Sequence, residues 1–304
     1  MKFEITILGS GSSIPTLERH STAQLVNLRE NYFLLDCGEG TQIQMRRFKV
    51  PYSKINHIFI SHLHGDHYLG LIGFISSMNL LGRKTDLTVY GNSELKTIID
   101  QHLRVSGTRL NFKMHFKALN YDKKELIHEN NYIRIYSFPT KHRIPCCGFL
   151  FEEKERELRL DKQALKDYKI PVAKMAGIKK GDDFVTPAGK TIKNKLLTLP
   201  KEKVYSYAFS ADTCYSKKVI EAVKGVDVLY HESTFLEDLL DRAKKTFHST
   251  AKQAAKVALE ASVKKLYMGH FSVRYNKFEE FVKEAREVFK NSYVVNDGDV
   301  IKIY

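Results

Sequence analysis

The sequence predicts an α/β fold built as a sandwich of four layers, with two β-sheets face to face and helices outside them. Strand-like runs come first as hairpins and then alternate with helical segments, and this order occurs twice along the 304 residues. A chain of this length, 43% of it apolar, can bury one large core. We therefore expect a single domain over residues 1–304, interrupted by an insertion at residues 153–203 where the pattern breaks.

The first half is expected to open with a strand and a hairpin. Residues 1–8, Met-Lys-Phe-Glu-Ile-Thr-Ile-Leu, are predicted to form a strand, and the small residues 9–13 after it allow a loop close to a ligand. Polar residues 29–31 separate two further apolar runs and predict a hairpin. The expected elements that follow residue 8 are strands at 23–28 and 32–36, a helix ending at Phe48, a strand at 57–61, a helix from Asp66 or His67 to Asn79, and strands at 87–90, 111–116, 132–138 and 148–152.

The second half is expected to alternate strands with amphipathic helices. Apolar side chains recur there at helical spacing in four segments, each of which follows a strand-like run. Ser249 and Thr250 precede the third of these helices and are typical N-cap residues. The expected strands are 205–210, 226–231, 265–268 and 293–296, and the helices are about 216–224, 235–245, 249–262 and 277–290.

Three imidazoles and one carboxylate are concentrated in the turn His62-Leu63-His64-Gly65-Asp66-His67, directly after an apolar run. Imidazole nitrogen and carboxylate oxygen are ligands that suit zinc, with manganese or iron as alternatives. Only 12 histidines occur in the whole chain, so a cluster of this kind indicates a metal site rather than a polar loop.

One metal ion takes three or four protein ligands, so other segments must contribute. Three coordinating residues, His142, Asp212 and His270, each follow a strand-like run. Loops at the carboxyl ends of strands are where α/β proteins assemble their sites. Each residue alone would more often be an ordinary polar side chain, but their recurrence beside a four-ligand turn favours metal binding.

Basic charge is concentrated in the insertion. The chain carries a net charge of +14, and residues 154–195 hold 12 basic and six acidic side chains, which is +6 in under a sixth of the length. Such charge attracts polyanions. A solvated loop without a role is the alternative, but we prefer a basic arm that grips a phosphate backbone.

The cysteines and the hydropathy predict a cytoplasmic protein. The four cysteines form no Cys-x-x-Cys pair, and buried reduced thiols are the default for such residues in the cytosol. No apolar run reaches the length of a bilayer, and the amino terminus lacks a signal-peptide layout. We expect no association with a membrane.

The chain resembles the metallo-β-lactamase superfamily through its His-x-His-x-Asp-His turn, and within it the match narrows to the ribonuclease Z family. The turn is specific only to the superfamily, whereas several later motifs make the narrower match. These motifs are Asp36–Gln42, Phe138–Gly148, Ser210–Thr213, His231–Phe235, His248–Thr250 and Gly269–Tyr275, and together they span nearly the whole chain.

The resemblance implies a metallo-β-lactamase fold and two Zn²⁺ per subunit, with Mn²⁺ as the alternative ion. It assigns His62, His64 and His142 to one ion, Asp66, His67 and His270 to the other, and Asp212 to a bridge between them. It also implies that Asp66 accepts a proton from the nucleophile, and that His248 donates one to the departing oxygen. His231 and Glu232 would orient His248, and Asp36 would support a ligand histidine.

The function implied is endonucleolytic removal of the 3′ trailer from precursor transfer RNA by a metal-activated hydroxide. The tRNA keeps a 3′-hydroxyl and the trailer a 5′-phosphate. Members of the family are homodimers in which one subunit's arm holds the tRNA cut by the other, and Lys174, Lys179 and Lys180 are the arm residues expected to contact RNA. The arm lacks the family's usual Gly-Pro pair.

Two other functions are weighed against this one. A small-molecule hydrolase of the same fold, acting on a phosphodiester, a thioester or a lactone, would share the metal turn but has no need of a basic arm. A non-catalytic RNA-binding relative would lack metal ligands, yet all seven ligand positions and His248 are filled.

Overall fold

The computed structural model describes residues 3–304 and divides them into two units. The main unit comprises residues 3–128, 135–151 and 205–304, and the arm unit comprises residues 129–134 and 152–204. The expected strand at residues 1–8 is found from Phe3 onward, and its first two residues lie outside the described part. Between residues 3 and 304, no helix has the length and apolar character needed to cross a membrane.

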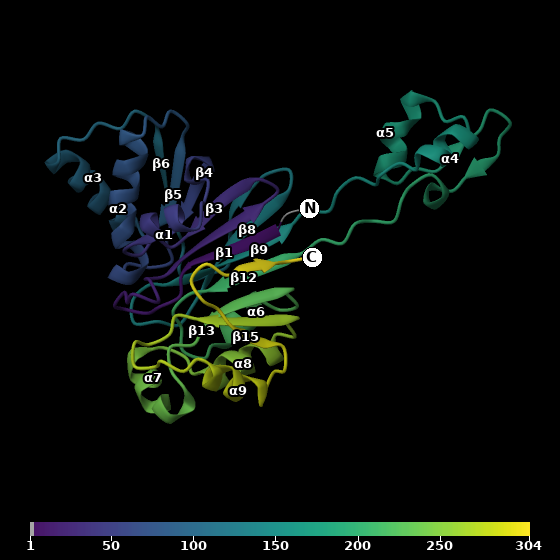
Figure 1. Ribbon diagram of the computed structural model, residues 1–304. Coiled ribbons are helices and arrows are strands. Elements are labelled where there is room, and N and C mark those ends of the chain that lie inside the picture. The colour runs from purple at the N-terminus through teal and green to yellow at the C-terminus, as the bar shows by residue number, and fades with distance from the viewer. Residues whose placement is uncertain (1–2) are drawn as a thin grey trace. The chain divides into compact units, whose positions relative to one another are not determined.

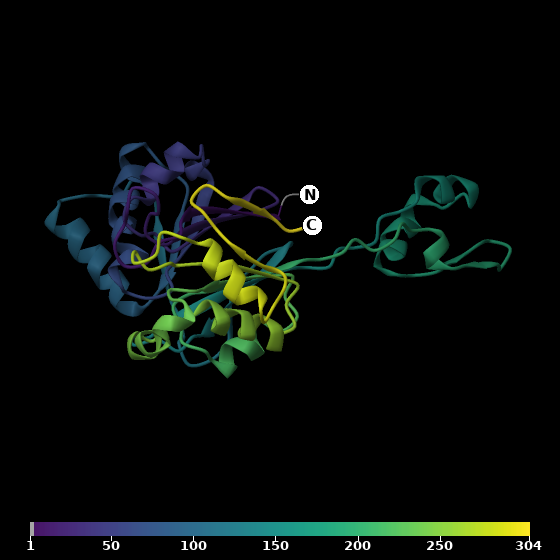
Figure 2. The same cartoon turned by 60° about the horizontal axis from the view of Figure 1, so that its bottom comes forward.

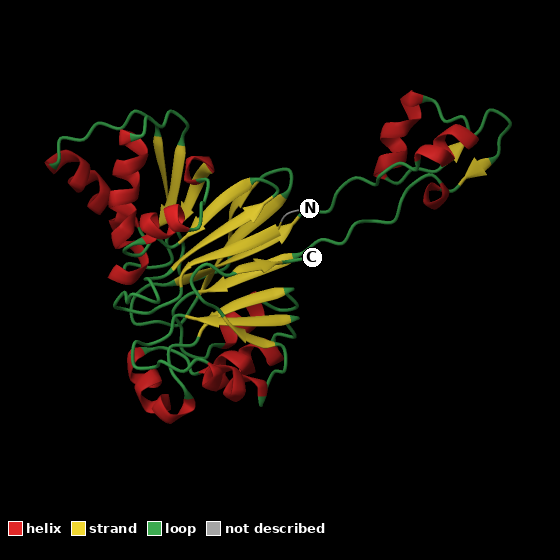
Figure 3. Ribbon diagram, in the orientation of Figure 1, coloured by secondary structure: helices red, strands yellow, loops and turns green. Residues whose placement is uncertain are grey.

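Two seven-stranded sheets form the centre of the main unit (Figures 1 and 3). The first sheet has, in spatial order, β16 (Val300–Lys302), β1 (Phe3–Gly9), β2 (Ala23–Leu28), β3 (Asn31–Leu35), β4 (Ile55–Phe59), β5 (Leu87–Gly91) and β6 (Met114–Ala118). The second has β15 (Ser292–Val294), β14 (Lys265–Gly269), β13 (Val228–Glu232), β12 (Ser206–Ser210), β9 (Cys147–Glu153), β8 (Ile133–Pro139) and β7 (Glu125–Glu129).

Helices cover the outer face of each sheet, so the predicted four-layer α/β sandwich is confirmed (Figure 3). On the first sheet lie α1 (Thr41–Arg47), α2 (Gly65–Leu80) and α3 (Ser93–Val105). On the second lie α6 (Lys217–Ala222), α8 (Ala251–Glu260) and α9 (Glu279–Arg286), with α7 (Leu240–Thr246) before α8. Figure 2 shows α8 and α9 side by side beneath this sheet.

Aromatic side chains fill the space between the sheets. Because successive strand residues point to opposite faces, Ile58 of β4 enters the helix-covered core while Phe59 points toward the second sheet. The Phe59 ring lies 5.4 Å from that of Phe149 on β9, measured between centroids, and Phe149 stacks in turn on Phe209. These contacts hold the two sheets together and so fix the loops of one against the loops of the other.

Most expected elements are found, with a few differences. Thr250 is the N-cap of α8, in a capping box with Gln253, as predicted. The strand expected at 111–116 instead forms at Met114–Ala118, because Phe112 is buried in the core outside the ladder. Helix α3 was not expected, although Asn92 caps its first turn and Leu95 and Ile99 form its buried stripe.

The arm unit has a small core of its own. It contains α4 (Lys162–Asp167), α5 (Val172–Lys180), the short pair β10 (Phe184–Val185) and β11 (Thr191–Ile192), and a 3₁₀ turn at Asn194–Leu196. Its buried apolar residues are Ala164, Ile170, Ile178, Phe184, Ile192 and Leu197. The insertion is therefore folded rather than a structureless loop. The main unit has two 3₁₀ turns among its described residues, at Tyr52–Lys54 and Glu237–Leu239.

Replacing Ile178 by Ala should destabilise the arm unit by about 2–5 kcal/mol, because a 1% exposed side chain would leave a cavity. Hydrogen exchange should accelerate at amides of residues 160–197 and stay unchanged in the two large sheets. Val172→Ala, on the same helix but 80% exposed, is the matched control and should change neither. Accelerated exchange throughout the main unit would contradict a separate arm core.

Candidate metal centre

The histidine turn links strand β4 to helix α2, each of which has one buried face. Strand β4 ends at Phe59, and α2 begins at Gly65 with His64 as its N-cap. Asp66 and His67 therefore lie in the first helical turn, where their spacing directs them toward the loops of the second sheet. The side chains of His62 and His67 are fully buried.

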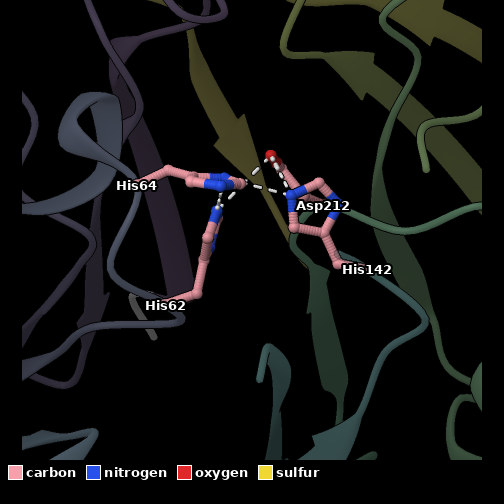
Figure 4. A group of neighbouring side chains, drawn as sticks. All are labelled: His62, His64, His142 and Asp212. Carbon is pink, nitrogen blue, oxygen red and sulfur yellow. Dashed lines mark hydrogen bonds and ion pairs between the residues drawn. The ribbon is translucent and has the colours of Figure 1, made fainter. Parts of the chain in front are cut away.

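The first cluster combines His62, His64, His142 and Asp212 (Figure 4). Nδ1 of His64 lies 3.0 Å from Nε2 of His62 and 3.1 Å from Nε2 of His142. Oδ2 of Asp212 lies 3.5 Å from Nε2 of His62. His62 and His64 follow β4 of the first sheet, whereas His142 and Asp212 follow β8 and β12 of the second. The candidate ligand atoms therefore come from both sheets.

The second cluster combines Asp66, His67 and His270. Nε2 of His67 lies 3.3 Å from Nε2 of His270, and the latter atom lies 3.3 Å from Oδ2 of Asp66. Oδ1 of Asp212 lies 3.2 Å from Nε2 of His270. The two oxygens of Asp212 thus face different clusters, which is the arrangement of a bridging ligand.

Four of the five converging histidines are held through their other ring nitrogen by a serine, a threonine, an aspartate or a carbonyl group. The partners are Ser61 Oγ for His62 (3.0 Å), Asp36 Oδ2 for His67 (2.7 Å), the Phe247 carbonyl for His142 (2.9 Å) and Thr234 Oγ1 for His270 (3.0 Å). Such outer contacts fix the tautomer and orientation of metal ligands. Sequence reasoning anticipated only Asp36 among these partners.

The protonation states of the first cluster suit metal binding. Burial lowers the pKa of His62 well below its usual value, and lowers that of His64 to about 4, so both rings are neutral. Burial alone would raise the pKa of Asp212, but His270, His67 and His62 hold it well below its ordinary range. Neutral imidazoles and an ionised carboxylate are the forms that coordinate metals. In the second cluster, burial would lower the pKa of His67, but the charges of Asp212 and Asp66 raise it well above its usual value, so a metal ion there would displace a proton.

The donor set fits two divalent cations. Oδ1 of Asp212 is buried and accepts no hydrogen bond from residues 3–304, and imidazole nitrogens face one another across both clusters. A pocket of about 380 Å³, here called the metal pocket, opens onto both clusters and is also lined by Ser13, Glu39, Arg143 and His248. The ligand atoms are therefore accessible to a substrate.

His248 lies beside the clusters and is paired with a buried carboxylate. Its Nδ1–H donates to Oε1 of Glu232 at 2.8 Å. Burial alone would lower the pKa of His248, but the charge of Glu232 outweighs it and raises the pKa to about 9. His231 is not brought to His248, because neighbouring strand residues point to opposite faces; its Nδ1–H donates to the Glu232 carbonyl instead.

Three residues at the centre have a left-handed backbone without being glycine: Asp36, Phe247 and His270, with φ of 55°, 58° and 61°. Such conformations cost about 1–3 kcal/mol each and collect at functional sites. At Asp36 the turn lets the carboxylate accept from Ser61 N–H and Oγ as well as from His67. At Phe247 it accompanies the carbonyl contact that holds His142.

Several contributors were not identified from the sequence. Ser61, Thr234 and the Phe247 carbonyl orient ligand rings, and the backbone N–H of Ser13 donates to Oδ2 of Asp66 at 2.7 Å. In the sequence, the one feature that could have identified these residues is their position within or next to the motifs of the candidate ligands. The expected arm residues Lys174, Lys179 and Lys180 are all exposed on α5.

Comparison with known proteins places the chain in a family. A family model described as "Anti-Pycsar protein Apyc1" matches residues 3–171, which include the histidine turn and His142 but neither Asp212 nor His270. The Ribonuclease Z of Parabacteroides distasonis is 44% identical over 296 residues, covering 97% of each chain. The chain belongs to the ribonuclease Z family. The resemblance predicted from the motifs is thereby confirmed.

Solved structures agree on the fold. Human tRNase Z, short form, superimposes with a TM-score of 0.71 at 23% identity and covers 99% of both chains. The metallo-β-lactamase fold protein YhfI of Bacillus subtilis superimposes with a TM-score of 0.70 at 18% identity over the full length of both. At these identities the likeness shows a shared metallo-β-lactamase fold.

Replacing Asp36 by Asn should weaken metal binding about 10–100-fold, because the amide loses the charge-assisted bond that fixes the His67 ring. Competition with a chromogenic chelator measures the affinity. Asp86→Asn makes the same change at a surface pair, where Asp86 Oδ2 lies 2.8 Å from His115 Nε2, and should leave metal affinity unchanged. Equal affinities in the two variants would remove this role for Asp36.

Proposed function

We propose that this member of the ribonuclease Z family is a metal-dependent endoribonuclease that removes the 3′ trailer from precursor tRNA. The tRNA would keep a 3′-hydroxyl and the trailer a 5′-phosphate. One observation carries the proposal: two ligand clusters share Asp212 and lie beside a His248–Glu232 pair, in a chain that matches ribonuclease Z along its length. We also propose a cytoplasmic location, which is the one that the sequence predicts.

The proposed metals are two Zn²⁺ per subunit, with Mn²⁺ as the alternative. His62, His64 and His142 would hold one ion and Asp66, His67 and His270 the other, with Asp212 between them. When bound, such ions neutralise the phosphate charge and lower the pKa of coordinated water. Imidazole and carboxylate ligands without a thiolate suit either ion.

Asp66 and His248 have complementary proton-transfer roles in this proposal. Burial would raise the pKa of Asp66, but His67 and His270 hold it far below its ordinary range, so its carboxylate is ionised and can accept a proton from the attacking water. Glu232 keeps His248 protonated at neutral pH, as the raised pKa indicates. His248 can therefore supply the proton that the departing 3′-oxygen requires.

The arm unit favours RNA over a small substrate. Its 12 basic side chains against six acidic ones, over residues 154–195, suit a phosphate backbone. A phosphodiesterase, thioesterase or lactonase of the same fold would share the metal centre but would have no use for this charge. Lys174, Lys179 and Lys180 are the proposed RNA contacts, since all three are exposed on α5.

We also propose that the enzyme is a homodimer in which the arm of one subunit holds the tRNA cut by the other. Exposed apolar side chains on the first helical layer supply a surface for association. Ile43 of α1 is 66% exposed, and Leu80 of α2 is 86% exposed.

His248→Ala should lower the rate of precursor tRNA cleavage about 10²–10⁴-fold, because the ribose 3′-oxygen leaves poorly without a proton donor. Hydrolysis of bis(p-nitrophenyl) phosphate should fall far less, since p-nitrophenolate leaves without one. Single-turnover rates for both substrates, with metal content measured alongside, check this. An equal loss on the two substrates would assign His248 to the metal centre instead.

Complementation should test the arm and the dimer together. A chain in which residues 154–195 are replaced by a short Gly-Ser linker keeps the metal centre but loses the arm core, and a His248→Ala chain keeps the arm. Each should cleave precursor tRNA poorly alone, and mixing them with subunit exchange should restore about a quarter to a half of the activity, as expected for statistical mixing in closed dimers. No recovery in confirmed mixed dimers would show that the arm does not act across subunits.

A further inference from the structure

Arg143 is the only lysine or arginine among the described residues that line the metal pocket. It lies in the loop between β8 and β9, directly after the ligand His142. The loop is fixed on both sides: Lys141 N–H donates to Thr213 Oγ1 at 3.0 Å, and Thr140 N–H donates to the Cys146 carbonyl at 3.1 Å. The backbone at Arg143 is therefore held by the fold, while its side chain is exposed.

The side chain of Arg143 contacts His64. Nη2 of Arg143 lies 3.2 Å from Nε2 of His64, and a guanidinium can only donate, so this contact requires Nε2 to accept. Nδ1 of His64 is the atom that faces His62 and His142. If Nδ1 held an ion, the ring proton would lie on Nε2, and two donors would face each other. The guanidinium would then be available to an anionic ligand.

A second cavity, of about 670 Å³, adjoins the metal pocket and shares His142 and Arg143 with it. Tyr121 contributes an aromatic wall. The hydroxyl of Tyr121 is buried without a hydrogen-bond partner among residues 3–304, while the residue as a whole is only partly buried. The exposed part of Tyr121 therefore does not include its hydroxyl.

Away from Arg143, the second cavity is lined by acidic rather than basic side chains. Asp122 and Glu125 line it, and both are exposed acids that disfavour a phosphate there. Asn92 and Asn120 also line the cavity; because their Oδ1 atoms accept from the N–H groups of Glu94 and Asp122, their Nδ2 groups are the atoms that could donate to a base edge. The cavity thus suits a nucleobase, whereas the anion belongs at Arg143.

We propose that Arg143 and Tyr121 form a nucleotide subsite for the RNA strand beside the cut. The guanidinium binds a phosphate oxygen next to the metal pocket, and the Tyr121 ring stacks on the base of the adjoining nucleotide in the second cavity. The inference rests on the proposed function, because it assigns part of the same RNA substrate. Base stacking on aromatic side chains tolerates any sequence, so the subsite reads a single strand rather than a particular base.

Arg143→Ala should raise the half-saturating concentration of precursor tRNA about tenfold while the maximal rate changes little. Arg143→Lys should give a half-saturating concentration between those of the wild type and Arg143→Ala, because lysine keeps the charge but lacks the planar guanidinium. Lys141→Ala removes an exposed charge two residues earlier that lines neither cavity, and it should stay within about twofold of the wild type. Metal content and hydrolysis of bis(p-nitrophenyl) phosphate should be unchanged in all three.

A loss of metal or of small-ester hydrolysis in Arg143→Ala, as large as the loss on RNA, would make Arg143 a support for His64 and overturn its substrate role. An unchanged half-saturating concentration would overturn it too. A wild-type enzyme that does not cut precursor tRNA would instead remove the proposed function, so the two failures are distinguishable.

Stacking is tested by fluorescence. Precursor tRNA carrying 2-aminopurine either just before or just after the cut is mixed with the metal-loaded enzyme in a stopped-flow instrument and read before cleavage. Quenching is expected at one of these positions. Tyr121→Phe should keep the quenching, because it removes only an unpartnered hydroxyl, whereas Tyr121→Ala should abolish it and raise the half-saturating concentration about tenfold.

Thermal unfolding and metal content of the two Tyr121 variants verify that both are folded. Quenching at neither position in the wild-type enzyme would overturn the stacking subsite. Quenching that persists in a folded Tyr121→Ala protein would overturn it as well, since the base would then stack elsewhere.

Discussion

The main unit depends on one electrostatic constraint, the fully buried carboxylate of Asp212. Its two oxygens face imidazole nitrogens from both clusters, at 3.2 Å on one side and 3.5 Å on the other. His142 donates its Nδ1 proton to a carbonyl, so its Nε2 atom presents a lone pair to the centre. Burial would lower the pKa of His67, but the charges of Asp212 and Asp66 raise it well above its usual value, so its ring carries a positive charge that faces Asp212. Metal ions at the two clusters would replace this charge, and their binding would release a proton.

The surrounding structure holds this arrangement in place. Ligands of the first sheet meet ligands of the second because the aromatic layer around Phe59 and Phe149 fixes the distance between the sheets. Strained turns at Asp36 and His270 then aim individual side chains, at a cost that the rest of the fold offsets. Glu232 has a parallel role for His248, since one buried carboxylate sets both its orientation and its charge.

In the proposed function, chemistry and RNA binding would be divided between different parts of the chain. The main unit contains the ligand clusters and the His248–Glu232 pair, and the arm unit has its own core and much of the excess positive charge. Arg143 adds a single cation at the metal pocket itself. A substrate that extends well beyond one phosphodiester, as a transfer RNA does, would contact the metal centre, Arg143 and the arm unit.

The sequence by itself determined the fold class, the family and the ligand types, because these follow from hydrophobic periodicity and from short motifs such as His62–His67. Thr250 could likewise be recognised as a cap, since capping is local. Only the tertiary structure decided that Asp212 faces both clusters, that His231 points away from His248, and that Ser61, Thr234 and the Phe247 carbonyl hold the ligand rings. Those facts depend on which residues meet across two sheets, and contacts between segments distant in sequence leave no local pattern to read.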